Sequence, residues 1–166
     1  MVYLRDQNFM AMVGGMPVKP SRMEDAWMMF QLANFCNGLP GDYVLMEPEL
    51  WAARIFAQIA SQVGKTVHIV SMFNEDLHGS REEFQTLLKG FSGYCQFHGD
   101  GRAEIGGDWA MVYLNSEQWL DSNAMYERIV DRGCVFASMN CGQVLQGWPQ
   151  VLTIRMPTGP TIYLMR

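Results

Sequence analysis

Asp42–Met72, DYVLMEPELWAARIFAQIASQVGKTVHIVSM, predicts a strand, a helix and a second strand in direct succession. Tyr43–Met46 is a short apolar run of strand-forming residues, and Thr66–Val70 is a β-branched run that one histidine interrupts. Pro48 stands where a first helical position tolerates the missing N–H, and Gly64 is the residue type that commonly ends a helix. The chain therefore builds a layered fold in which a helix covers a sheet.

The segments around this unit predict further helices. We predict a first strand over Asn8–Val13 and then a helix that begins at the capping-box sequence Ser21–Glu24, in which two side chains satisfy backbone N–H groups. A second capping box, Ser80–Glu83, predicts a short helix that ends near Gly90. The helix over Glu49–Val63 has its polar residues at spacings of three and four, which leaves most of its surface apolar and indicates burial.

The second half of the chain predicts hairpins. Tyr94–His98, Arg102–Ile105 and Trp109–Leu114 are short runs separated by turns of glycine and aspartate, which is typical of an antiparallel meander. We predict that a helix, a strand and a closing hairpin follow, over Glu117–Asp131, Cys134–Ser138, Val151–Met156 and Thr161–Met165.

The predicted fold class is α+β, with mixed α/β layers. A central mixed sheet contains an N-terminal strand-helix-strand unit, the antiparallel meander around residues 94–114 and a C-terminal hairpin, and the helices pack on this sheet. No linker, repeat or low-complexity segment interrupts the sequence, so we expect a single domain over residues 1–166.

Composition disfavours several classes of protein. The chain has 166 residues, 49% of them apolar and 17% charged, which fits a globular domain with a core of ordinary size. Its 12 basic residues against 17 acidic ones give a net charge of −5, so binding of nucleic acid through phosphates is disfavoured. No apolar segment reaches the length of a membrane span, and the four cysteines lack the C-x-x-C spacing of a zinc site. We expect a cytoplasmic protein with reduced thiols, and we predict no cofactor and no metal ion.

Methionine and aromatic residues suggest an interaction surface. The chain has 14 methionines, and this flexible side chain builds adaptable contact surfaces as well as cores. Trp27, Met28 and Met29 lie in a helical stretch with more apolar residues than one buried face needs. Trp148, between a glycine and a proline, is the tryptophan that we most expect to be exposed. We predict that the chain is a small acidic protein-interaction or regulatory module, which binds a partner protein or itself through these residues.

A second hypothesis is a small enzyme or ligand-binding protein that acts on a polar or nucleotide-like small molecule. Glu47 and Asn74 follow two successive predicted strands, and ligands of open α/β sheets bind at the carboxyl ends of strands. Glu47 could instead stabilise the N-terminus of the next helix. Gly15 and Lys19 lie between a predicted strand and a helix, where a phosphate could bind, although their spacing matches no phosphate-binding motif and a plain turn also explains them.

The enzyme hypothesis could depend on a thiol. Cys141 follows a predicted strand in a polar turn, and it would need a base such as His98. The order His98, then Asp108 or Asp121, then Cys141 followed by glycine resembles that of adenain- and Ulp-type cysteine peptidases. Asp108 stands before a tryptophan where those peptidases have histidine, so the activity of that family is not carried over. His98 and Asp100 could also bind a metal ion, but a hairpin turn explains Asp100 fully.

Overall fold

The computed structural model describes residues 1–74, 78–99, 105–116, 122–138 and 150–165. Its strands in these ranges are β1 (Asp42–Met46), β2 (Val67–Val70), β3 (Cys95–His98), β4 (Trp109–Leu114), β5 (Ile129–Ala137), β6 (Gln150–Arg155) and β7 (Thr161–Met165). Its helices are α1 (Gln7–Gly15), α2 (Met23–Cys36), α3 (Leu50–Val63), α4 (Arg81–Leu87) and α5 (Ser122–Arg128), with 3-10 helices η1 (Val2–Arg5) and η2 (Lys89–Tyr94).

One sheet contains all of these strands, in the order β3-β2-β1-β4-β5-β7-β6. The strands from β3 to β5 are parallel, whereas β7 runs antiparallel to β5 and β6 runs antiparallel to β7. The predicted class of mixed α/β layers around a mixed sheet, with a C-terminal hairpin, is confirmed. The chain builds outward from β1 to β3 and then returns to the other side of β1, so the strand order reverses between β1 and β4.

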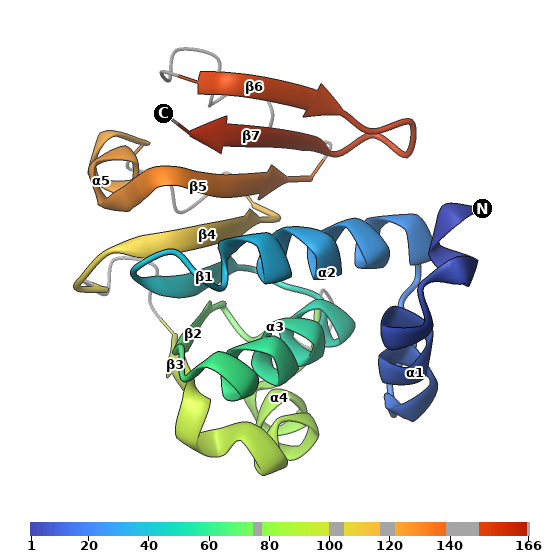
Figure 1. Ribbon diagram of the computed structural model, residues 1–166. Coiled ribbons are helices and arrows are strands. Elements are labelled where there is room, and N and C mark those ends of the chain that lie inside the picture. Colours follow the sequence, from blue (N-terminus) through green and yellow to red (C-terminus); the bar gives the residue numbers. More distant parts are fainter. Residues whose placement is uncertain (75–77, 100–104, 117–121, 139–149, 166) are drawn as a thin grey trace.

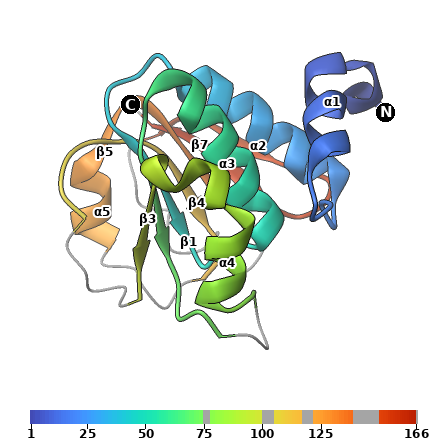
Figure 2. The same cartoon turned by 90° about the horizontal axis from the view of Figure 1, so that it is seen from below.

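Helices cover both faces of this sheet. α2 and α3 lie side by side on one face, with α4 next to α3, and α5 lies on the other face (Figures 1 and 2). Tyr43 and Leu45 of β1 point into the larger core under α2 and α3, and Val44 and Met46 point into the smaller core on the side of α5. Because both faces are covered, β1 is an unbroken apolar run rather than an alternating one.

The strand-helix-strand unit predicted over Asp42–Met72 is confirmed as β1, α3 and β2. Gly64 ends α3 in the left-handed conformation, with φ of 75°, as the sequence predicted. Ile55 and Phe56 of α3 are fully buried, because the helix packs its apolar side on the centre of the sheet. No helix of the described residues is long and apolar enough to cross a membrane.

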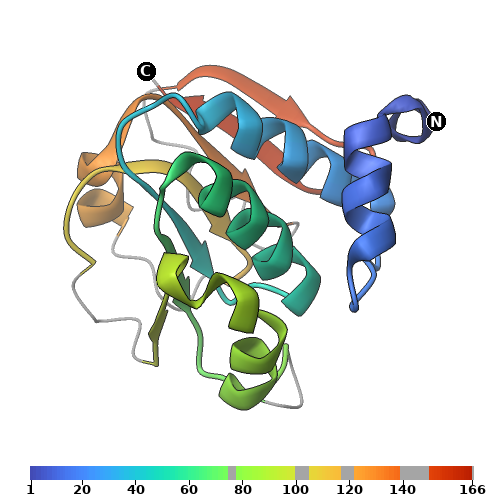
Figure 3. The ribbon, with the colours of Figure 1, turned by 60° about the horizontal axis from the view of Figure 1, so that its bottom comes forward.

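The predicted strand over Asn8–Val13 is wrong, because these residues belong to α1. The Asp6 carboxylate accepts a hydrogen bond from the backbone N–H of Phe9 at 3.0 Å and thereby caps the helix. Its other oxygen accepts from Trp27 Nε1 at 3.1 Å and from Gln31 Nε2 at 2.7 Å. These bonds hold α1 across α2 (Figure 3).

The antiparallel meander predicted around residues 94–114 is also wrong. β3 and β4 run parallel to each other, and β2 and β1 lie between them. The middle run of the predicted meander, Arg102–Ile105, lies outside the described residues except for Ile105. All six residues of β4 are buried, which is the pattern of a central parallel strand covered on both faces. The helix predicted over Glu117–Asp131 is too long, since α5 ends at Arg128 and β5 follows at once.

One of the two predicted capping boxes is confirmed. Ser80 Oγ accepts from the Glu83 N–H at 3.2 Å, and the Glu83 carboxylate accepts from the Ser80 N–H at 2.7 Å. The box at Ser21–Glu24 is wrong, because α2 begins at Met23 and the preceding residue makes no side-chain cap hydrogen bond.

Substitution of Gly41, which precedes β1, tests how closely this turn packs against the backbone before β4. Gly41 has φ of 92°, and a Cβ added there would overlap the backbone carbonyl of Asp108. We expect Gly41→Ala to lower the free energy of unfolding by about 2–4 kcal/mol, from left-handed strain and the clash together. Gly38→Ala is the matched control, because a Cβ there meets open space. Urea denaturation measures both, and equal stabilities of the two variants would contradict the packing of this turn.

Candidate functional site at the carboxyl edge of the sheet

Strands β1, β2 and β4 end at the same edge of the sheet, next to the point where the strand order reverses. In open α/β sheets this is where ligands bind, because the connections on the two sides diverge and leave a crevice. The residues that follow these strands therefore form the candidate site.

Glu47 is the centre of this edge. Its side chain is 5% exposed, and its backbone has φ of 50°, a left-handed conformation that is rare for a residue with a side chain. Its carboxylate accepts from Ser71 Oγ at 2.9 Å and from the backbone N–H of Met72 at 2.6 Å. Its carbonyl accepts from Asn115 Nδ2 at 3.0 Å. Glu47 therefore joins the segments that follow β1, β2 and β4.

Glu49, rather than Glu47, is the N-cap residue of α3. The Glu49 side chain makes no cap hydrogen bond, and its Oε2 is buried without a hydrogen-bond partner among the described residues. Its Oε1 lies 3.5 Å from Ser21 Oγ. The N-terminus of α3 favours negative charge here, and the Glu49 carboxylate has acceptor capacity to spare.

A cavity of about 590 Å³ lies between Leu50, the first residue of α3, and the start of α4. Its volume is in the usual range for a small-molecule site. Its acidic lining residues are Glu82 and Glu83, and no lysine or arginine of the described residues lines it. The cavity and Glu49 together favour a ligand that carries positive charge or hydroxyl groups, and they disfavour a phosphate.

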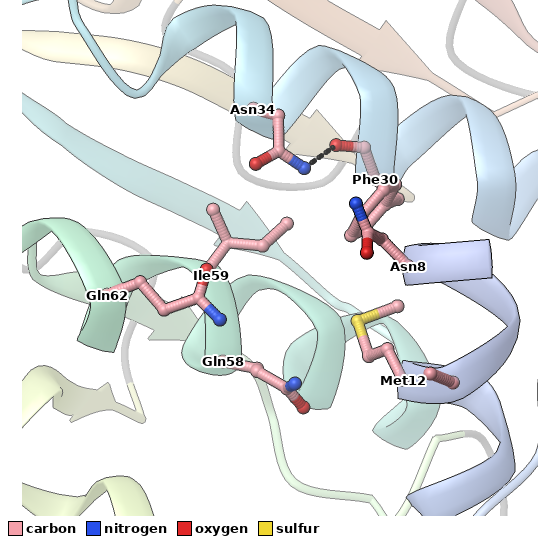
Figure 4. A pocket seen from close by; sticks show the side chains of 8 residues that line it. Asn8, Met12, Phe30, Asn34, Gln58, Ile59 and Gln62 are labelled. Carbon is pink, nitrogen blue, oxygen red and sulfur yellow. Dashed lines mark hydrogen bonds between the residues drawn. The ribbon is translucent and has the colours of Figure 1, made fainter. Parts of the chain in front are cut away.

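A second cavity, of about 400 Å³, lies among α1, α2 and α3 (Figure 4). Among the described residues, its lining includes no charged side chain and four carboxamides, those of Asn8, Asn34, Gln58 and Gln62. Gln58 and Gln62 belong to the second half of α3, which runs away from the carboxyl edge. This cavity is therefore separate from the candidate site.

Of the residues that the sequence predicted to bind a ligand, Asn74 lies at the same edge as Glu47, whereas Gly15 and Lys19 lie at the end of α1. β1 and β2 are parallel neighbours, and Asn74 lies in the segment after β2, exposed at the same edge as Glu47. Gly15 ends α1, and Lys19 Nζ donates to the carbonyls of Val13 at 2.7 Å and Gly14 at 2.9 Å. Because this ammonium is engaged at the carbonyl end of a helix, the geometry does not favour a phosphate there.

His98 lies at the end of β3, and its ring contacts another histidine. His68 Nδ1 is 3.1 Å from His98 Nε2, and His68 Nε2 is 3.3 Å from Asp42 Oδ2. Burial lowers the pKa of His98, and the nearby His68 and Arg81 lower it further. Cys141, Trp148 and Asp100 lie outside the described residues. Within the described ranges, no group of three or more His, Cys, Asp or Glu side chains could hold a metal ion.

The residues predicted to bind a partner do not form an exposed patch in α2. Met29 is fully buried, and Met28 and Trp27 are half-buried against the larger core. The Trp27 indole donates to Asp6, so the segment before α1 covers it. The sequence analysis did not include this cover, because it placed a strand where α1 lies.

Sequence reasoning missed Ser71, Asn115, Glu49, His68 and Asp42. Ser71 and Asn115 directly follow strands, which is a signal that was available. The grouping of Asp42 with the histidines depends on the order and register of three strands, which the sequence did not supply.

No family model matches the sequence, and no curated protein is detectably similar to it. Many solved structures share its fold. An SAH-bound methyltransferase from Podospora anserina matches with a TM-score of 0.65 at 11% identity, over 97% of this chain and 87% of that one. A methyltransferase from Geobacter sulfurreducens matches with a TM-score of 0.59 at 12% identity, over 99% of this chain and 89% of that one. A SAM-dependent O-methyltransferase from Thermotoga maritima matches with a TM-score of 0.60 at 11% identity, over 90% of this chain and 66% of that one.

This chain has the fold of these methyltransferases. The sequence-based prediction of a protein-binding module, with a partner protein or a second copy as its ligand, is therefore corrected. The fold is shared with proteins named as enzymes, one of them with a bound small molecule. The alternative hypothesis of a small-molecule site at the strand ends agrees better with this result.

The hydrogen bonds of Glu47 give a stability test. We expect Glu47→Ala to lower the free energy of unfolding by about 2–4 kcal/mol, because it leaves the Met72 N–H and the Ser71 hydroxyl without their acceptor. Ser71→Ala should cost less, about 1 kcal/mol, since the carboxylate keeps the Met72 bond. Glu127→Ala, at an exposed residue of α5, is the control. Chemical denaturation measures all three, and a Glu47→Ala protein as stable as the control would contradict the bonding described.

Proposed function

We propose that this chain binds S-adenosylmethionine at the carboxyl edge of β1, β2 and β4 and transfers its methyl group to a small molecule. The observation that carries the proposal is the buried Glu49 oxygen, which has no hydrogen-bond partner among the described residues, at the edge where the strand order reverses. The shared fold with methyltransferases supports the same reaction class.

The turn between β1 and α3 supports a ligand without phosphate. Dinucleotide-binding folds place glycines in this turn so that their backbone can approach a pyrophosphate. Here the turn carries Glu47, Pro48 and Glu49, which adds two carboxylates and removes one N–H. A pyrophosphate would meet repulsion at this place. S-adenosylmethionine has no phosphate and carries positive charge on its sulfonium and its ammonium, so the residues fit it.

In this proposal Glu49, Glu47 and Asn74 have different roles. Glu49 supplies negative charge at the start of α3, and its free oxygen accepts a hydrogen bond or faces a cation. Glu47 holds the segments after β1 and β2 at a fixed separation through Ser71 and Met72. Asn74 adds an amide at the same edge. The sulfonium supplies an electrophilic methyl group when the ligand is bound, and the protein has to orient it and exclude water.

We include a cytoplasmic location in the proposal. Cys36, Cys95 and Cys134 are free thiols, and free thiols are usual in reducing compartments.

Isothermal titration calorimetry tests the proposal with S-adenosylmethionine and S-adenosylhomocysteine. We expect the wild-type protein to bind both. Glu49→Gln should weaken the binding of S-adenosylmethionine about tenfold, equivalent to about 1.4 kcal/mol, because a charged acceptor is lost. It should weaken the binding of S-adenosylhomocysteine less, because that ligand lacks the sulfonium charge.

Glu127→Gln is the matched control, since it removes one exposed carboxylate on the other face of the sheet. We expect it to bind both ligands as the wild type does. Circular dichroism establishes that each variant is folded. Folded wild-type protein that binds neither ligand would refute the proposal, and equal affinities of the two variants would refute the role of Glu49.

A further inference from the structure

Three ionisable side chains form a continuous chain across β1, β2 and β3. Asp42 begins β1, His68 lies in the middle of β2 and His98 ends β3. The register pairs His98 with Val70, so the two histidines are offset by two positions and lie on the same face of the sheet. His68 Nδ1 lies 3.1 Å from His98 Nε2, and His68 Nε2 lies 3.3 Å from Asp42 Oδ2. His68 is 7% exposed, so its ring has little access to water.

The chemistry of the groups fixes the protons when both rings are neutral. An ionised Asp42 can only accept, so His68 must carry its proton on Nε2. His68 Nδ1 then has a lone pair and can only accept from His98. His98 must therefore carry its proton on Nε2, which leaves a lone pair on His98 Nδ1. The far end of the chain is thus a proton acceptor.

A proton added to His98 Nδ1 moves the charge along the chain. His98 passes its Nε2 proton to His68 Nδ1 and becomes neutral again, now with its proton on Nδ1. His68 becomes an imidazolium that donates to Asp42 on one side and to His98 on the other. Two imidazolium rings cannot face each other across 3.1 Å, because both nitrogens would be donors. The pair therefore binds one proton in place of two.

The surrounding groups disfavour a positive charge on His98. Burial lowers the pKa of His98, and His68 and Arg81, at the start of α4, lower it further. The Asp42 carboxylate lies 3.3 Å from His68 Nε2. Lys65 is close to Asp42, and its ammonium donates to the carbonyls of Leu39 and Gly41.

The free end of this chain lies at the carboxyl edge that forms the candidate site. The backbone N–H of Ser71 donates to the carbonyl of His98 at 3.1 Å, and Ser71 Oγ donates to Glu47 at 2.9 Å. His98 and Glu47 are thus joined through one residue. Asp42, in contrast, is anchored at the opposite end of β1, where its Oδ1 accepts from the Thr66 N–H at 2.9 Å.

We propose that Asp42, His68 and His98 form one proton-accepting unit, in which His98 takes a proton from a weakly acidic O–H or N–H group of the bound ligand. The inference rests on the proposed function for the ligand that supplies this proton. The O–H or N–H bond breaks, its electron pair stays on the ligand, and the proton binds His98 Nδ1. His68 holds the resulting positive charge beside Asp42. His68 and Asp42 are positioning residues, because they act through His98.

Nitrogen-15 NMR of the imidazole rings tests the unit without any ligand. The chain has three histidines, so His78 serves as an internal reference outside the unit. At high pH we expect His68 and His98 both to carry their proton on Nε2. As the pH falls, His68 should become doubly protonated while His98 switches its proton to Nδ1, in a single step. A proton on His98 Nδ1 at high pH, or two independent titrations, would overturn the inference.

Two variants distinguish a specific effect of Asp42 on the histidine pair from the general effect of removing a nearby negative charge. Asp42→Asn should lower the pKa of the His68–His98 pair by about one unit or more, which is a tenfold loss of proton affinity. Asp108→Asn is the control, because this exposed acid lies next to Asp42, and its backbone carbonyl accepts from the Asp42 N–H at 2.9 Å. We expect it to shift the pair by less than about 0.3 units. Equal shifts in the two variants would overturn the role of Asp42, and the wild-type spectrum tests the tautomers even if Asp42→Asn does not fold.

The pH profile of methyl transfer connects the unit to the reaction. We expect the rate to fall as the pH drops through the pKa of the pair, and Asp42→Asn should move this fall to lower pH by the same amount as in the spectra. A profile that Asp42→Asn leaves unchanged would overturn the role of His98 as proton acceptor. A protein with the expected tautomers that transfers no methyl group would refute the proposed function and leave the proton-sharing chain established.

Discussion

The buried carboxylate of Glu47 is the constraint on which the candidate site depends. A charged group without contact to water is tolerated only when its hydrogen bonds are satisfied. Ser71 and Met72 satisfy it, and this fixes the segment after β2 against the end of β1. The left-handed backbone at Glu47 turns the chain directly from β1 into α3, so Glu49 and the start of the helix stand at the edge of the sheet.

The electrostatics of this edge follow from that turn. Two carboxylates occupy the place where phosphate-binding folds have glycine, and the lining of the nearby cavity includes Glu82 and Glu83 and, among the described residues, no base. Lys19, the one cation that the sequence analysis had singled out for a phosphate, is engaged by α1. The acidic turn thus disfavours a phosphate at this edge of a fold that the chain shares with methyltransferases.

Local patterns in the sequence predicted much of the local secondary structure correctly. They failed to predict which strands become neighbours, because contacts between distant segments determine that. Asp42–Met72 was predictable because its strand and helix signals and Gly64 agree with the tertiary structure. Asn8–Val13 was not predictable, because a short apolar run fits either a helix or a strand. The hydrogen bond by which Asp6 caps α1 favours the helix. The meander failed because glycine-rich turns do not report whether two strands become neighbours. His68 stood out as the histidine in a β-branched strand, but its contacts with Asp42 and His98 depend on a register across three strands.

Carbon-13 NMR of methionine methyl groups, during a titration with S-adenosylhomocysteine, tests the location of the ligand most directly. Met46 ends β1 and Met72 follows β2, whereas Met12 lines the separate carboxamide cavity. If the ligand binds at the carboxyl edge, the signals of Met46 and Met72 shift together with one dissociation constant and Met12 stays unchanged. Shifts at Met12 with Met46 and Met72 unchanged, or no shift at any methionine of the folded protein, would contradict a ligand site at this edge.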